Sequence, residues 1–138
     1  MSTVFYAEKC AKYAASHMKA KSLHKCATYV RNAIENENGG NLQLKGHPIY
    51  ASSYYHHMEK WGFRKVFEGT QREFSTFKPQ NGDISVIAGK VPNKKNSAIG
   101  HIQIYYNGKW ISDFPCSTAW CYNDKSRPFA IWRHKNRQ

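Results

Sequence analysis

A cysteine near the start of a predicted helix is the first residue of this chain whose placement favours nucleophilic chemistry. Cys26 lies in the run HKCATYVRNAI, where apolar residues recur at helical spacing, and Ser22 precedes it as an N-cap for a helix over 23–36. The unpaired N–H groups and positive dipole at a helix N-terminus stabilise a thiolate, and His24 and Lys25 add positive charge. We therefore predict that Cys26 is a nucleophile. The alternative is a small buried apolar residue on a helix face.

A histidine and an aspartate lie on a predicted β-hairpin later in the chain. His101 opens the run GHIQIYY, where it alternates with isoleucines as strand residues do. Asn107-Gly108 favours a tight turn, and the returning run WISDF would bring Asp113 towards His101. The imidazole could accept the thiol proton, and the carboxylate could orient the ring. The alternatives are a structural histidine within a strand and a turn-forming aspartate at a strand end.

The order of the predicted elements indicates an α+β fold. Three helices come first: one over 4–20, one over 23–36 that Gly39 and Gly40 end, and one over Ser52–Lys60 that Gly62 closes. Five short runs of alternating or β-branched residues follow, at Arg64–Phe67, Asp83–Ala88, Ile99–Tyr106, Trp110–Phe114 and Phe129–Arg133. Helices followed by a meandering antiparallel sheet are typical of this class, and 138 residues suit one domain over 1–138.

The charge of the chain indicates a class of partner. A net charge of +12 attracts polyanions, which include nucleic acid, anionic lipid surfaces and cell wall. The basic residues are scattered and form no binding tail. No run approaches the roughly 18 apolar residues that span a bilayer. Because Glu8, Lys9 and Lys12 interrupt the start of the chain, we also expect no secretory signal.

The combination of these motifs resembles a known family. A cysteine that opens a helix (HKCATYVRNAI), a Gly-Asp-Ile entry into a strand (NGDISVI), and Gly-His-Ile in the next strand (GHIQIYY) followed by WISDF look like the NlpC and CHAP group of papain-like amidases and endopeptidases of bacterial peptidoglycan. The resemblance covers roughly 23–114. It implies a papain-like fold in which Cys26 is the nucleophile, His101 the base and Asp113 the orienting residue. It also implies a thioester acyl-enzyme and no metal or organic cofactor.

Within this family the chain is most similar to the small amidase effectors that bacteria inject into rivals by type VI secretion. That resemblance implies peptidoglycan as the substrate, a cognate immunity protein and a secretion apparatus component as partners, and no membrane insertion. The protein would be made in the cytoplasm without a signal peptide and would act in the periplasm of a target cell. In that oxidising compartment we expect a disulfide between Cys116 and Cys121, with two free thiols as the alternative.

Two other functions fit parts of the sequence. A basic, tyrosine-rich chain with an antiparallel sheet could be a nucleic-acid-binding module, although no RNA-binding motif is present and the resemblance implies no nucleic acid. Such a module would bind with steep salt dependence and would tolerate Cys26→Ala. The same fold could also serve a phage or self-directed lytic enzyme, or a papain-like transferase or protease that acts on protein.

Overall fold

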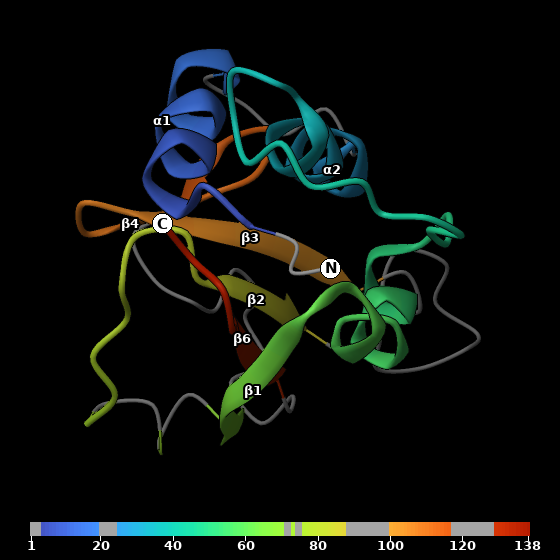
Figure 1. The fold of residues 1–138 in the computed structure, drawn as a ribbon. Helices are drawn as coiled ribbons and strands as arrows, with labels where there is room; N and C mark the ends of the chain where they lie inside the picture. The colour runs from blue at the N-terminus through green and yellow to red at the C-terminus, as the bar shows by residue number, and fades with distance from the viewer. Residues whose placement is uncertain (1–3, 20–24, 71–72, 74–75, 88–99, 117–128) are drawn as a thin grey trace.

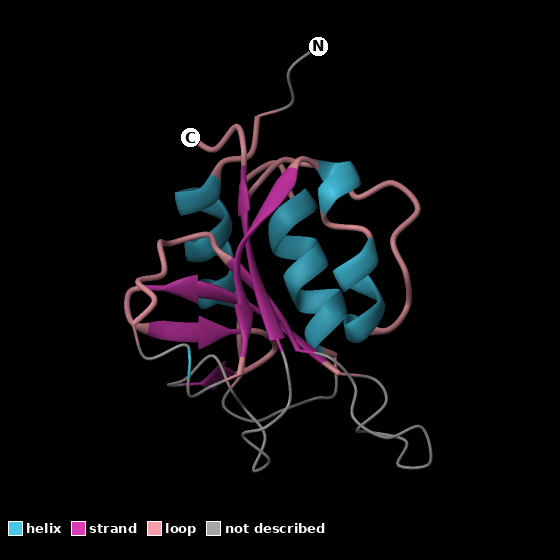
Figure 2. Ribbon diagram, turned by 90° about the horizontal axis from the view of Figure 1, so that it is seen from below, coloured by secondary structure: helices cyan, strands magenta, loops and turns pink. Residues whose placement is uncertain are grey.

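Two α-helices lie side by side over one face of an antiparallel sheet (Figure 1). The computed structural model describes residues 4–19, 25–70, 73, 76–87, 100–116 and 129–138. The helical elements are α1 (Ala7–His17), α2 (Cys26–Glu35) and two short 3-10 helices, η1 (Ala51–His56) and η2 (Glu59–Trp61). The predicted α+β arrangement, with N-terminal helices packed on an antiparallel sheet, is confirmed (Figure 2).

The sheet contains six strands in the order β1-β6-β2-β3-β4-β5. Their bounds are β1 Phe63–Gly69, β2 Ile84–Ile87, β3 His101–Tyr106, β4 Lys109–Ile111, β5 Pro115–Cys116 and β6 Phe129–His134. The predicted meander holds from β2 to β4, and β5 is an additional strand because the predicted run Trp110–Phe114 ends as a strand at Ile111. The meander is wrong at the end of the chain, where β6 returns between β1 and β2. All four residues of β2 and the first four of β6 are buried, as central strands require.

The two faces of the sheet bury different clusters. On the helical face, Ile102 and Ile104 of β3 belong to the larger apolar cluster that includes residues of α1 and α2. Ile87, Trp110, Phe129 and Ile131 form a smaller cluster. Because strand side chains alternate between faces, the Ile102 side of β3 faces the helices and places α2 against this strand.

The helices differ in extent from the predicted ranges. Helix α1 is shorter than the predicted 4–20 at both ends, and α2 begins at Cys26 with Lys25 as N-cap, later than the predicted start at residue 23. The predicted cap Ser22 lies outside the described residues. The third predicted helix is instead η1 followed by η2, in a segment rich in Ser, Tyr and His, which are weaker α-helix formers. Gly62 ends it in the left-handed region, at φ 96°.

The predicted hairpin turn has the expected structure. Asn107 and Gly108, at φ 46° and 89°, connect β3 to β4 as a tight hairpin, in which Tyr106 pairs with Lys109. Asp83 is fully buried before β2 and accepts hydrogen bonds from Arg133 Nε and Nη2 at 2.9 and 2.8 Å. These bonds join the start of β2 to β6.

Candidate active site

Cys26 is the first residue of α2, and it lies against β3. Three backbone N–H groups, those of Ile102, Ala27 and Cys26 itself, lie near its sulfur and favour the thiolate form. The side chain of Cys26 is partly exposed and packs on the edge of the larger apolar cluster. The sulfur is therefore held between a helix terminus and the beginning of a strand.

The protonation of Cys26 differs from the sequence-based expectation. Burial raises the pKa of the thiol above its ordinary value, and the negative charge of Asp113 raises it further. The three backbone N–H groups lower the pKa, as the helix terminus predicts, but burial outweighs them. The expected stabilisation of a resting thiolate is thus wrong in net direction. The thiol is protonated near pH 7 and needs a base to become nucleophilic.

His101 opens β3 directly after a glycine in the left-handed region. Gly100 has φ 75°, and a Cβ there would meet the Ile87 carbonyl oxygen and lie 2.7 Å from Ser52 Cβ of η1. A glycine is therefore required to bring the chain into β3 at this point. The imidazole of His101 is 8% exposed. Burial lowers its pKa to about 4, against raising effects from the charge of Asp113 and a hydrogen bond with the Gln103 side chain. At neutral pH it is therefore an uncharged group that can accept a proton.

Asp113 is fully buried beside the start of α2. Its Oδ2 accepts a hydrogen bond from the Lys25 N–H at 3.1 Å, and its Oδ1 accepts one from the Ser112 hydroxyl at 3.1 Å. Its backbone carbonyl accepts the Lys19 N–H at 2.7 Å. Lys25 is the N-cap residue of α2 and forms no side-chain cap itself. Its backbone bond to Asp113 therefore ties the segment after β4 to the beginning of that helix.

Asp113 lies near both of the other predicted site residues. Its carboxylate influences the pKa of Cys26 and that of His101, and Cys26 lies against Ile102, the residue next to His101. The hydrogen-bonding role of Gln103 was not predicted. Alternation along β3 could have identified it, because Gln103 lies two residues from His101 and so on the same face of the strand.

The cysteines fall into two groups. Cys10 and Cys26 are free, whereas Cys116, on β5 opposite Trp110 of β4, is disulfide-bonded. The predicted partner, Cys121, lies outside the described residues, so the Cys116–Cys121 pairing stays a prediction.

Across the described part of the chain, no group of three His, Cys, Asp or Glu side chains could hold a metal ion. None of the helices formed by these residues has the length and apolar character needed to cross a bilayer.

Comparison with known proteins identifies two solved structures of similar fold. No family model matches the chain, and no curated protein matches its sequence. A chain in the crystal structure of the native type VI effector–immunity complex Tae3-Tai3 from Ralstonia pickettii aligns over 94% of this chain and 99% of its own length, with a TM-score of 0.74 and 28% identity. In the selenomethionine form of that complex, a chain aligns over 89% and 97%, with a TM-score of 0.66 and 29% identity. The predicted papain-like α+β class is confirmed by this similarity.

Proposed function

We propose that this chain is a peptidoglycan amidase or endopeptidase that acts as an antibacterial effector of type VI secretion. The observation that carries this proposal is the similarity, over nearly the whole of both chains, to a chain of a type VI effector–immunity complex. The chemistry is supported by the position of Cys26, which lies at a helix N-terminus against the strand that His101 opens. That arrangement suits attack of a sulfur nucleophile on an amide carbonyl.

The first step forms a thioester. Neutral His101 accepts the Cys26 thiol proton as the sulfur attacks the carbonyl carbon of a wall-peptide amide. The backbone N–H of Cys26, at the positive end of α2, is placed to stabilise the developing oxyanion. The imidazolium then gives its proton to the leaving amine as the C–N bond breaks. Asp113 stabilises that imidazolium, since its charge favours the protonated form of His101.

The second step releases the enzyme. Water attacks the thioester carbon while His101 accepts a proton from it, and the C–S bond breaks to give a carboxylic acid and the thiol. Because the thiol and the imidazole are both uncharged at rest, each cycle creates charge only as the bonds rearrange. The buried surroundings then make the fixed N–H groups and the Asp113 carboxylate more effective than they would be in water.

The proposal also assigns partners and a place of action. The effector would be loaded by a component of the secretion apparatus, would act in the periplasm of the target cell, and would be inhibited in its producer by a cognate immunity protein. Effector–immunity pairing is what the two similar solved structures contain.

Digestion of purified peptidoglycan tests the proposed activity. The wild type should release peptide fragments with new amine and carboxyl ends, identified by mass, whereas Cys26→Ala should release none. The control is Cys10→Ala, because Cys10 is the other free cysteine of the described residues and is fully buried in α1. Equal digestion by wild type and Cys26→Ala would contradict the nucleophile assignment. Absence of digestion by the wild type would contradict the substrate.

A further inference from the structure

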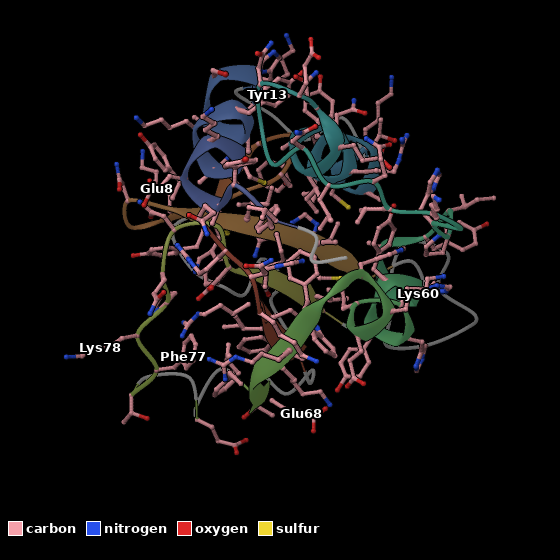
Figure 3. All side chains as sticks on the ribbon, viewed as in Figure 1. Glu8, Tyr13, Lys60, Glu68, Phe77 and Lys78 are labelled. Atoms are coloured by element: carbon pink, nitrogen blue, oxygen red, sulfur yellow. The ribbon has the colours of Figure 1, made fainter. Side chains whose placement is uncertain are left out.

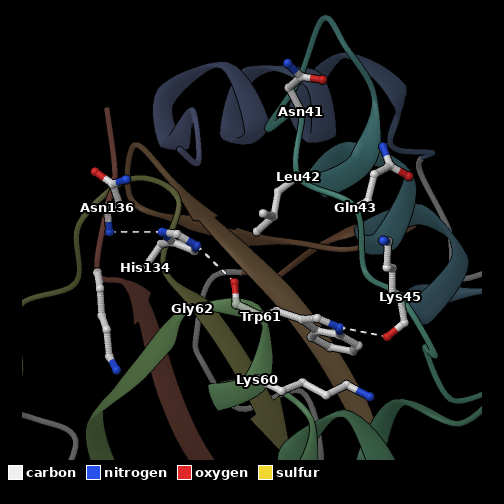
Figure 4. A pocket seen from close by; sticks show the side chains of 10 residues that line it. Asn41, Leu42, Gln43, Lys45, Lys60, Trp61, Gly62, His134 and Asn136 are labelled. Carbon is white, nitrogen blue, oxygen red and sulfur yellow. Dashed lines mark hydrogen bonds between the residues drawn. The ribbon is translucent and has the colours of Figure 1, made fainter. Parts of the chain in front are cut away.

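A pocket at the other end of α2 has a lining suited to an anionic ligand. It has a volume of about 750 Å³, within the range of ligand sites, and it is formed by the chain that follows α2, by η2 and by the end of β6 (Figure 4). Three lysines from these three segments line it: Lys45, Lys60 and Lys135. Among the described residues that line it, none carries a carboxylate.

The positive charge of this pocket is uncompensated. All three lysines are exposed, and within the described part of the chain none of them forms an ion pair. Lys60 Nζ instead lies 5.3 Å from the centre of the Trp61 ring. Ammonium groups around one hollow that pair with no described carboxylate attract anionic groups from solution.

The walls of the pocket are fixed by hydrogen bonds. The Trp61 indole N–H donates to the Lys45 carbonyl oxygen at 3.0 Å. The Asn136 N–H donates to His134 Nδ1 at 3.0 Å, so the imidazole proton is on Nε2, which donates to the Trp61 carbonyl oxygen at 3.0 Å. These three hydrogen bonds, drawn as dashed lines in Figure 4, form a frame around the pocket. The frame joins the chain after α2, η2 and β6, so the lysine-bearing segments are held in place before any ligand arrives.

The remaining lining indicates what kind of anion fits. The side-chain amide of Asn41 can donate to and accept from peptide or acetamido groups, and that of Gln43, whose Nε2 already donates to the Glu35 carbonyl oxygen at 3.3 Å, can accept. Leu42 and Trp61 supply apolar surface. Ammonium, amide and apolar groups together match a carboxylate carried on a peptide or an acylated amino sugar, better than they match a bare inorganic anion.

The pocket is separate from the candidate active site. Cys26 begins α2, whereas the lining residues at 41–43 follow its C-terminal end. A helix of 10 residues spans roughly 15 Å, so a single sugar or amino-acid residue cannot occupy both places. A polymer can reach both.

We infer that this pocket is a second binding site for the carboxylate-bearing peptide and amino-sugar units of the wall polymer. The inference rests on the proposed function for the identity of the polymer. A contact away from the scissile bond would hold the enzyme on an insoluble substrate between cleavage events, as linked contacts raise overall affinity.

Binding of a soluble muropeptide with free carboxylates tests this inference, in a Cys26→Ala background that prevents turnover. We expect the indole N–H resonance of Trp61 to shift on titration, and the affinity to fall roughly tenfold when the three pocket lysines are changed to Gln. The matched control changes Lys9, Lys78 and Lys109 to Gln, which removes the same charge from exposed positions outside this pocket. It should alter affinity by less than about twofold.

The other arms of the experiment separate the sources of error. A muropeptide with amidated carboxylates should bind the unchanged pocket weakly. Its affinity should equal that of the unmodified muropeptide for the variant whose three pocket lysines are changed to Gln. An unshifted Trp61 resonance, equal losses in pocket and control variants, or a response to inorganic phosphate but not to the muropeptide would overturn the inference. Digestion of peptidoglycan by the wild type is measured separately. Failure there with muropeptide binding intact would count against the proposed function alone.

Discussion

The two ends of α2 handle charge in opposite ways. At the N-terminal end, burial raises the pKa of Cys26 and lowers that of His101, so both groups are uncharged at neutral pH, and Asp113 is the buried carboxylate beside them. At the C-terminal end, three exposed lysines surround a hollow, and none of the described residues that line it carries a carboxylate. Burial keeps the thiol and the imidazole uncharged at one end, whereas the lysines at the other end are exposed and charged.

This difference separates the groups that attract a polymer from the groups that would react with it. The net charge of +12 does not ionise the candidate nucleophile, because the effect of burial on Cys26 exceeds the effect of the backbone N–H groups around it. Charge on the surface acts on encounter with a polymer, whereas the buried pair acts on bond breaking. Each of the following predictions tests one end against the other.

The largest effect is expected from His101→Gln. Glutamine cannot accept the thiol proton, so hydrolysis of peptidoglycan should fall about a thousandfold, within the usual range for loss of a general base. The control is His47→Gln, because His47 is exposed and lies between α2 and η1. A loss of less than about tenfold, with an unchanged fold, would show that the thiol is activated without this imidazole.

The next effect is on stability in acid. His101 has a pKa of about 4 in the folded protein against an ordinary 6.5, so the unfolded chain binds its proton first and stability falls as pH drops from 6.5 towards 4. At about 1.4 kcal/mol for each pKa unit, this histidine removes about 3 kcal/mol over that range. Burial also lowers the pKa of His134, which adds a loss of the same sign.

Urea unfolding at pH 7 and pH 4 measures this loss. His101→Gln should lose about 3 kcal/mol less than the wild type between the two values, because Gln does not titrate. His47→Gln should follow the wild type. If His101→Gln retains the full acid sensitivity, then His101 is not the buried neutral group that the structure describes.

Gly62, which lines the pocket, and Gly108, in the β3–β4 hairpin, are a matched pair of glycines. Both have positive φ, at 96° and 89°, but a Cβ at Gly62 would lie 2.6 Å from His134 Nε2, whereas a Cβ at Gly108 would meet nothing within 4 Å. Gly108→Ala should therefore cost about 1 kcal/mol of backbone strain. Gly62→Ala should cost about 2 kcal/mol more, because it also displaces the His134–Trp61 hydrogen bond. If urea unfolding shows that both variants lose the same free energy of unfolding, the His134–Trp61 hydrogen bond does not stabilise the walls of the pocket.

Local patterns predicted local structure well. Asn107-Gly108 predicted the β3–β4 hairpin, and the HKCATYV run placed Cys26 in the first turn of a helix, because both depend on neighbours in the sequence. The insertion of β6 between β1 and β2 depends on contacts between distant segments, and turn signals do not specify these. The runs ISVI and FAIW, apolar without clear alternation, are the feature that could have indicated central strands.

For the candidate site, the sequence predicted three residues, whose catalytic roles stay predictions, and it did not predict their resting charge. Residue types and order indicated Cys26, His101 and Asp113, and the structure brings all three to the start of α2 and β3. The resting charge was wrong because burial is a property of the folded packing, and burial is the largest influence on both the thiol and the imidazole. The pocket lysines are far apart in the sequence, so no local pattern could identify them.

The smallest effect is expected from Asp113→Asn, and its direction separates two roles for this residue. The negative charge of Asp113 raises the pKa of Cys26, so Asn should lower that pKa and move the alkylation rate profile of the thiol with iodoacetamide to lower pH. The same charge favours protonated His101, so hydrolysis should slow although the thiol ionises more readily. Glu68→Gln removes an equal charge at an exposed strand position, where the side chain points outward (Figure 3), and should change neither. A faster alkylation at low pH together with slower hydrolysis identifies Asp113 as a partner of the imidazole. An unchanged alkylation profile would show that its carboxylate serves only to hold Lys25 at the start of α2.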